Sequence, residues 1–158
     1  MAYGIRWQIN FSSVAEKDYR VNILDNGWTG SVTQLTGSDD PFVIEEDDDP
    51  DTFTPIRTKT GYINIVTDNI NLVRNIIPMT GATRKVVALE WDENDEEWVE
   101  IFVGWVQPQL IGIDIWQGKT EIGIPVECCL SGLKYRMYKR TGFIYLNEVL
   151  ADGFSNFN

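Results

Sequence analysis

Apolar and polar residues alternate with a period of two along much of this chain, and this alternation restricts its fold more than any other feature. Successive side chains of a β-strand point to opposite faces of a sheet, so the pattern predicts strands that bury one face. It occurs at 19–24, 62–66 and 120–128. It is clearest near the N-terminus, where four apolar residues alternate with three polar ones: Ile5, Trp7, Ile9 and Phe11 with Arg6, Gln8 and Asn10.

The first expected hairpin surrounds the dipeptide Asn26-Gly27. It follows a strand in which Val21 and Ile23 are expected to point inward, and Asn-Gly favours the positive φ angles of a tight turn. We therefore expect residues 28–35 to form the returning strand, which ends at the turn-forming residues 36–38.

A second, clearer hairpin is expected to join 84–91 to 97–106 through the acidic residues 92–96. Alternate apolar residues are predicted to line one face of each strand: Val87, Leu89 and Trp91 in the first, Val99, Ile101 and Val103 in the second. Pro125 interrupts the strand at 120–128. Because proline has no N–H to donate to a neighbouring strand, we expect an edge strand or a β-bulge there.

Two short helices complete the expected elements. The first covers 68–77 and ends before Pro78, with an apolar stripe of Ile70, Val73, Ile76 and Ile77. The second begins with Thr141 as its N-cap and ends near Gly153, with a buried stripe of Phe143, Leu146, Val149 and Leu150.

At least six strand candidates with at most two short helices predict a mainly β fold, an antiparallel β-barrel or sandwich. The chain lacks the long helical crossovers that a parallel sheet needs, which excludes the doubly wound folds. Its 158 residues fit one domain with a short appendage. We assign 1–135 to the β-barrel or sandwich domain and 136–158 to a C-terminal helix and tail, consistent with the start of a further region.

The charge of the chain limits its partners. The formal net charge is −11 and the sequence pI is about 4.3. A nucleic-acid-binding protein needs cationic side chains to displace phosphate counterions, and a surface that docks on anionic lipid needs them too, so neither partner is expected. The chain has no apolar run of the roughly 18 residues that span a membrane, and its N-terminus lacks the features of a signal peptide. The expected location is the cytoplasm, at least until assembly.

The residues needed for most catalytic sites are missing. The chain contains no histidine, which excludes Ser-His-Asp and Cys-His nucleophilic catalysis. No glycine-rich phosphate-binding loop occurs. Cys128 and Cys129 are adjacent, where a disulfide would be strained, so they are predicted to be free thiols. We therefore expect no enzyme, no metal ion and no cofactor.

Two charged segments remain as candidate binding sites. The run 45–51 is acidic and contains Pro50, which predicts an exposed, mobile loop. A glycosidase would need two acids fixed across a cleft, and a calcium loop would need regularly spaced acids, which this run lacks. The basic segment 134–140 is a possible counterpart for the acidic loops, within one molecule or between copies, or else simply solvated surface. The predicted interaction residues are Asp47, Asp48, Asp49, Arg136, Lys139 and Arg140.

Several short strings, in the same order over most of the chain, resemble a family of bacteriophage and prophage tail and baseplate proteins, which is related in fold to tail hub and distal tail proteins. They are Gly27-Trp28-Thr29-Gly30, Leu35 to Pro41, Phe53 to Arg57, Thr60 to Val66, Phe102 to Pro108, Glu127 to Lys134 and Leu146 to Ala151. The resemblance implies a barrel-like domain that repeats around the tail axis, contacts copies of itself or other tail components, and brings no catalytic residues.

The leading hypothesis is accordingly a structural assembly module of a phage or prophage tail or baseplate. It would form a homo-oligomer in the intact assembly, in the virion tail and, during assembly, in the bacterial cytoplasm. The alternative from another functional class is a carbohydrate- or ligand-binding β-sandwich, in which exposed Trp28, Trp105 or Trp116 would stack on a sugar.

Overall fold

The computed structural model describes residues 2–46, 58–77, 83–107, 112–115, 120–129, 137–138 and 144–145. Among these residues, the elements in chain order are β1 (Tyr3–Ser12), β2 (Asp18–Asn26), β3 (Thr33–Gln34), β4 (Gly37–Glu46), β5 (Lys59–Thr67), α1 (Ile70–Ile76), β6 (Arg84–Asp92), β7 (Glu97–Val106), β8 (Gly112–Ile115), β9 (Thr120–Cys128), β10 (Met137–Tyr138) and β11 (Ile144–Tyr145).

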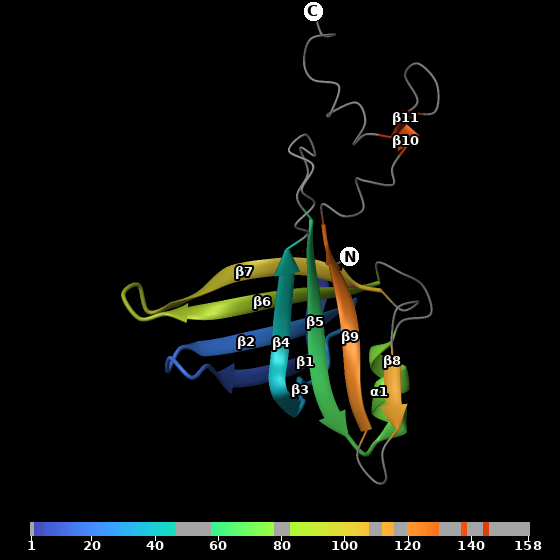
Figure 1. Cartoon of the computed structure of the whole chain (residues 1–158), viewed down its shortest axis with the longest axis horizontal. Helices are drawn as coiled ribbons and strands as arrows, with labels where there is room; N and C mark the ends of the chain where they lie inside the picture. The colour runs from blue at the N-terminus through green and yellow to red at the C-terminus, as the bar shows by residue number, and fades with distance from the viewer. Residues whose placement is uncertain are drawn as a thin grey trace, which may run out of the picture.

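One sheet dominates the fold. Its strands follow the order β3-β1-β2-β6-β7-β9-β5-β4, with β8 attached to β9, and β10 and β11 form a separate pair. All strand pairs are antiparallel except β1 with β3. The sheet bends over on itself, so that β4, β5 and β9 run across β1, β2, β6 and β7 (Figure 1). The predicted mainly β, antiparallel class is confirmed, in the form of one open sheet folded into two layers.

The core lies between these two layers. The β1–β2–β6–β7 layer contributes apolar side chains from its inner face, and β5 and β9 contribute theirs from the opposite side. The most buried of them are Trp7, Ile9, Val21, Ile23, Val86, Ala88, Phe102, Val106, Ile63, Ile65, Ile122, Ile124 and Val126. The predicted buried face is confirmed for Trp7 and Ile9 in β1 and for Val21 and Ile23 in β2, and the alternation at 62–66 likewise buries Ile63 and Ile65 in β5. The prediction is wrong for Ile5, which lies on the opposite face from Trp7 because a bulge shifts the register between these two residues.

The bend depends on β7, because the end of this strand belongs to both layers. Its residues 104–106 pair with β9, while Gly104 and Trp105 still pair with β6. A Cβ atom on Gly104 would lie 2.5 Å from the carbonyl oxygen of Glu127 and 2.7 Å from a methyl group of Val126. Only glycine fits between the layers at this position.

The hairpin of β6 and β7 is confirmed, but the predicted buried face is wrong. Val86 and Ala88 face the core, whereas Val87 and Leu89 lie on the opposite face and are partly exposed. In β7 the core face carries Phe102, Gly104 and Val106 instead of the predicted Val99, Ile101 and Val103. Both strands carry apolar residues on both faces, so alternation alone did not identify the inner one.

The hairpin predicted at Asn26-Gly27 is also wrong. Gly27 does adopt the expected positive φ, of 75°, but the chain does not return beside β2. It crosses the start of β1 and continues along the edge of β1 that faces away from β2. There, Thr33 and Gln34 form the short strand β3, which pairs with β1 in parallel. The edge of β2 at which we expected this return is occupied by β6 instead.

The turn predicted at 36–38 is wrong as well, because β4 already begins at Gly37. Gly37 pairs with Ile65 and Phe42 with Ile63, so residues 38–41 bulge out of the ladder. Pro41 lies in this bulge, on the edge strand β4. Its missing N–H therefore removes no hydrogen bond of the ladder.

Pro125 lies in an interior strand, contrary to the prediction of an edge or a bulge. β9 pairs with β5 on one side without a register shift, and with β7 and β8 on the other. The carbonyl of Pro125 accepts a hydrogen bond from the Gln107 amide at 2.9 Å. In an antiparallel ladder, the N and C=O of one residue point to the same side. The missing N–H therefore faces the gap between β7 and β8, where no strand needs it.

The first predicted helix is confirmed as α1, which is shorter than expected. The side chain of Asn69 accepts hydrogen bonds from the amides of Asn71 and Leu72 and so forms the N-cap. Val73 and Ile76 are buried as predicted. The second predicted helix is wrong where it includes Ile144 and Tyr145, which form β11; its other residues and the domain boundary at 135/136 lie outside the described residues.

Gly104→Ala is expected to lower the free energy of unfolding by about 1–3 kcal/mol, because the added methyl group overlaps atoms of β9. Gly123→Ala is the matched control: its Cβ would meet only Asn64 Oδ1, at 3.4 Å, and its effect should stay within about 0.5 kcal/mol. Urea denaturation followed by circular dichroism measures both. Equal effects of the two substitutions would contradict the role given to Gly104.

Candidate interaction surface

The outer face of the β1–β2–β6–β7 layer carries an unusual number of apolar side chains. Strand pairing arranges them in two groups: Ile5 faces Leu24, and Val87 faces Val103, while Lys85 lies between Leu24 and Trp105 on the same face. The ring of Tyr3 meets that of Trp105 edge to face, with centroids 5.6 Å apart. We call this the outer patch, and it comprises Tyr3, Ile5, Leu24, Val87, Leu89, Val103 and Trp105.

Every residue of the outer patch is partly exposed. Tyr3, the most open, keeps 37% of its surface accessible. The second layer covers only the inner face of these strands (Figure 1). A sheet with one solvated face normally alternates between apolar inner and polar outer residues. Strands that are apolar on both faces are typical of sheets covered on both sides, and a contiguous apolar surface marks an interaction site.

A network of polar side chains borders the patch on β1, β2 and β3. Gln8 Nε2 donates to Asn22 Oδ1 at 2.8 Å, and Gln34 Nε2 donates to Gln8 Oε1 at 2.8 Å. Arg20 Nε donates to Asn10 Oδ1 at 3.0 Å. Each of these side chains thus has a hydrogen-bond partner within the network. An apolar centre with a polar, hydrogen-bonded rim is the usual anatomy of a protein–protein interface.

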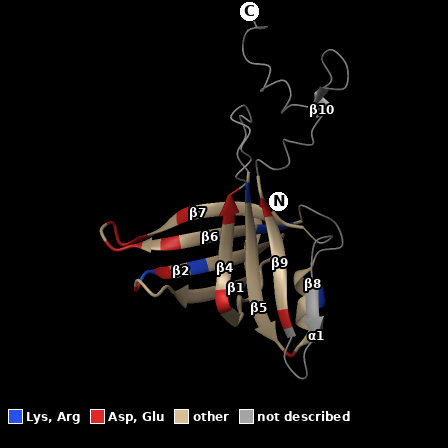
Figure 2. Cartoon of the chain, in the orientation of Figure 1, with Lys and Arg blue, Asp and Glu red and all other residues tan. Residues whose placement is uncertain are grey.

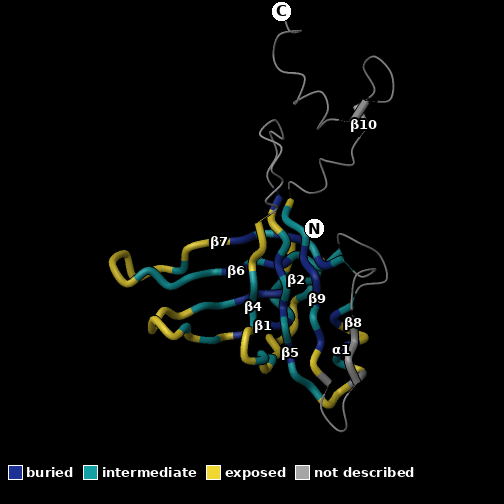
Figure 3. Tube along the Cα trace, viewed as in Figure 1, coloured by how far each residue is buried: buried dark blue, intermediate teal, exposed yellow. Residues whose placement is uncertain are grey.

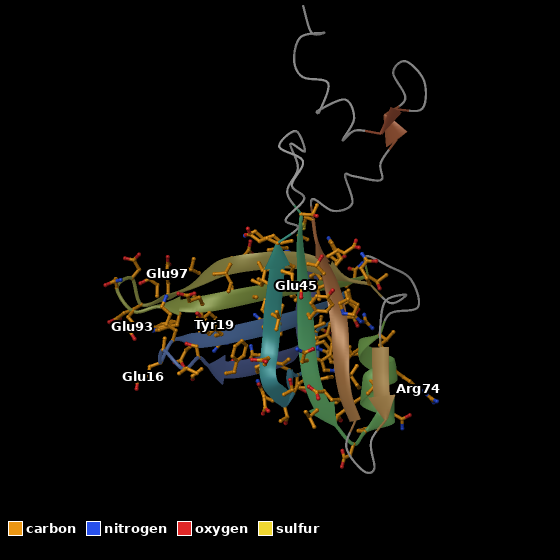
Figure 4. The ribbon with its side chains drawn as sticks, viewed as in Figure 1. Glu16, Tyr19, Glu45, Arg74, Glu93 and Glu97 are labelled. Carbon is orange, nitrogen blue, oxygen red and sulfur yellow. The ribbon has the colours of Figure 1, made fainter. Side chains whose placement is uncertain are left out.

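Beyond the second layer, the two hairpins project as an arm, residues 10–20 and 89–100 (Figures 1 and 3). The arm contains nine acidic and two basic residues, so its formal net charge is −7, compared with −11 for the whole chain. Figure 2 shows the acidic residues at its free end, and Figure 4 shows Glu16, Glu93 and Glu97 there. We call the residues Asp92–Glu97 the tip.

A single ion pair links the two hairpins of the arm. Lys17 contacts Glu90, and their hydrogen bond is the main cause that raises the pKa of Lys17 and lowers that of Glu90. Within the tip, the amide of Asn94 donates to Asp92 at 2.8 Å and so lowers the pKa of this carboxyl. Residues 93–97 are all exposed, so their carboxylates are open to a partner.

The opposite end of the same strands carries a cluster of cations. Asp25 is bound by Arg6 through Nη1, at 2.7 Å, and also by Arg84. The guanidinium of Arg6 lies 4.5 Å from the ring centre of Trp7 and 4.3 Å from that of Trp28. Arg84 also donates to the Asn75 carbonyl at the end of α1, at 3.3 Å. Burial and the charge of Arg6 lower the pKa of Arg84.

This arginine cluster (Arg6, Asp25, Arg84 and Trp28) has more donors than acceptors. Two arginines share one carboxylate, which leaves a formal charge of +1. Among the described residues, the Nε of Arg84 and the Nε1 of Trp28 are buried without a hydrogen-bond partner. Buried N–H groups are nearly always paired, so these two indicate an acceptor that completes the cluster.

The structure does not test the predicted interaction residues. Asp47, Asp48, Asp49, Arg136, Lys139 and Arg140 all lie outside the described residues, as does Trp116. Trp28 packs against Arg6 and Gly30, and Trp105 against Tyr3, so both tryptophans are partly buried. The outer patch was not predicted, although apolar residues on both faces of 84–91 and 97–106 indicate it.

Among the described residues, an open groove of about 400 Å³ lies between the link 34–36 and the start of α1. No group of three or more Cys, Asp or Glu residues is placed to hold a metal ion in this part of the chain. Within the described part of the chain neither Cys128 nor Cys129 forms a disulfide, and the sulfur of Cys128 accepts a hydrogen bond from the Lys59 amide at 3.4 Å. No helix among the described residues is both long and apolar enough to cross a bilayer.

Comparisons with protein-family models, with curated proteins and with solved structures gave no match.

Val87→Thr should change the free energy of unfolding by less than about 0.5 kcal/mol, because the new hydroxyl group reaches solvent on the outer face. Val86→Thr, one residue away on the inner face, buries the same group in the core and should cost about 1–3 kcal/mol. Urea denaturation of dilute protein distinguishes them. An equal loss at both positions would mean that the outer patch is part of the monomer core.

Proposed function

We propose that this chain is a structural assembly module whose outer patch packs against a neighbouring subunit. The observation that carries the proposal is the second apolar face of the β1–β2–β6–β7 layer, which the monomer does not need for its core. An assembly protein requires such a face, because association is driven by burying apolar surface that folding leaves open. The polar network on one side and the acidic arm on another supply a rim that keeps the free chain soluble.

The resemblance of the sequence to phage and prophage tail proteins supplies the biological setting of this proposal. The neighbours would be copies of the chain or other tail and baseplate proteins, in the virion tail and, before that, in the bacterial cytoplasm. The chain would act mechanically, as a stiff β scaffold without a substrate. Interfaces that hold permanent assemblies bury about 2,000 Å² or more, so the patch would be the centre of a larger contact.

The double substitution Val87→Thr/Val103→Thr tests the patch directly, because the two residues face each other across β6 and β7. It leaves two hydroxyl groups without partners in a buried contact and should weaken self-association about tenfold or more. Sedimentation equilibrium of the whole chain gives the association constant. The matched control is Val32→Thr/Val99→Thr, which changes two exposed valines outside the patch and should leave that constant unchanged.

Two results would contradict the proposal. One is an association constant that is the same for the patch variant and the control. The other is a wild-type chain that remains a monomer at every concentration and salt level while sugars quench its tryptophan fluorescence saturably. The second result would favour the carbohydrate-binding alternative.

A further inference from the structure

The arginine cluster offers an incomplete set of hydrogen bonds. Asp25 accepts one bond from each arginine, and the Asn75 carbonyl accepts one more. The buried Nε of Arg84 and Nε1 of Trp28 remain without an acceptor in the described part of the chain. An unpaired buried donor costs about 1–3 kcal/mol, so two in one cluster are a strong reason for a missing acceptor.

The charge and shape of the cluster define that acceptor. With two guanidinium groups and one carboxylate, the site has a surplus of one positive charge, which favours an anion over water. Guanidinium groups pair best with planar oxyanions, through charge-assisted hydrogen bonds. Arg6 keeps 25% of its side-chain surface exposed, against 15% for Arg84, so an incoming group meets Arg6 first. These properties indicate a carboxylate.

The chain itself presents carboxylates at the other end of the same strands. Arg84 begins β6 and Asp92 ends it, so cluster and tip lie about 27 Å apart along the strand. The tip is therefore out of reach of the cluster in the same molecule but available to the next. Opposite charges at the two ends of one sheet favour a head-to-tail contact, which generates rings or filaments of identical copies.

We infer that the arginine cluster is a carboxylate-binding site that receives an acidic side chain from the tip of another copy. The inference rests on the proposed function in one respect, namely that copies of the chain associate. It adds a direction to this association: the patch supplies apolar area, and the tip and cluster set the order of the copies.

The indole N–H of Trp28 is a direct reporter of the cluster, since its NMR signal moves when an acceptor binds beside it. The receiving protein is ¹⁵N-labelled and carries the substitutions Glu93→Gln, Asp95→Asn, Glu96→Gln and Glu97→Gln, which remove the four exposed carboxylates of its own tip and give what we call the tip-neutralised chain. The signal is assigned with Trp28→Phe. Unlabelled wild-type chain should shift it saturably, whereas unlabelled tip-neutralised chain should not.

A second unlabelled variant serves as the control for the loss of negative charge. An unlabelled chain with Asp39→Asn, Asp40→Asn, Glu45→Gln and Glu46→Gln loses four charges at the β4 edge instead of the tip and should shift the Trp28 signal as the wild type does. If all three unlabelled proteins have the same effect, the tip is not the occupant.

A titration with acetate tests whether the cluster binds a carboxylate that is not part of a protein. Titrated against chloride at equal ionic strength, acetate should shift the Trp28 signal saturably, and Arg6→Met should weaken this binding about tenfold or more. If acetate has no effect, the cluster is not a carboxylate site. If acetate binds and wild-type chain does not, the site stands and the head-to-tail contact is overturned. Sedimentation of the patch variant is unaffected by either result, so failure of the proposed function is seen separately.

Discussion

The structure depends on one strand that serves two layers. At its end, β7 pairs with β6 and with β9 at once, and this is possible because Gly104 lets the backbone of β9 approach to a distance that no side chain permits. The bend brings the inner faces of the two layers together and creates the core. It also decides which face of β6 and β7 is inner. The same constraint therefore leaves the other apolar face of these strands outside, without a cover.

This consequence explains which parts of the fold could be read from the sequence. In β1, β2 and β5 most of the residues that the alternation places inward, among them Trp7, Val21 and Ile63, are buried as expected. Ile5 is the exception, because a bulge before Trp7 turns it to the outer face. In β6 and β7 both faces are apolar, and the choice between Val86 and Val87 depends on a long-range bend that local pattern does not contain. The extra residue Ile101, which the register skips between Ala88 and Leu89, shifts the alternation further.

Turn and proline signals failed for a related reason. Gly27 takes the backbone angle that its dipeptide favours, yet a turn fixes only the local direction of the chain, and the edge of β2 is taken by β6. Pro125 lacks an N–H on the side of β9 where no neighbouring strand requires one. That position is left between two ladders because β7 and β8 pair with separate parts of β9. The arginine cluster was invisible in the sequence, because its residues come from three strands and from the segment after β2, and they are brought together only by strand pairing.

An apolar patch and two charged ends have different effects on assembly. Burial of the patch is non-directional and would hold copies in several arrangements with similar affinity. Charge pairs contribute less affinity, but they penalise the wrong arrangement, because like charges then meet. With a balance of −7, two arms placed side by side repel each other, whereas an arm placed at an arginine cluster does not. In the proposed contact, strand direction sets the direction of assembly, since the N-terminal ends of β1 and β6 carry Arg6 and Arg84 and the turn that follows β6 is acidic.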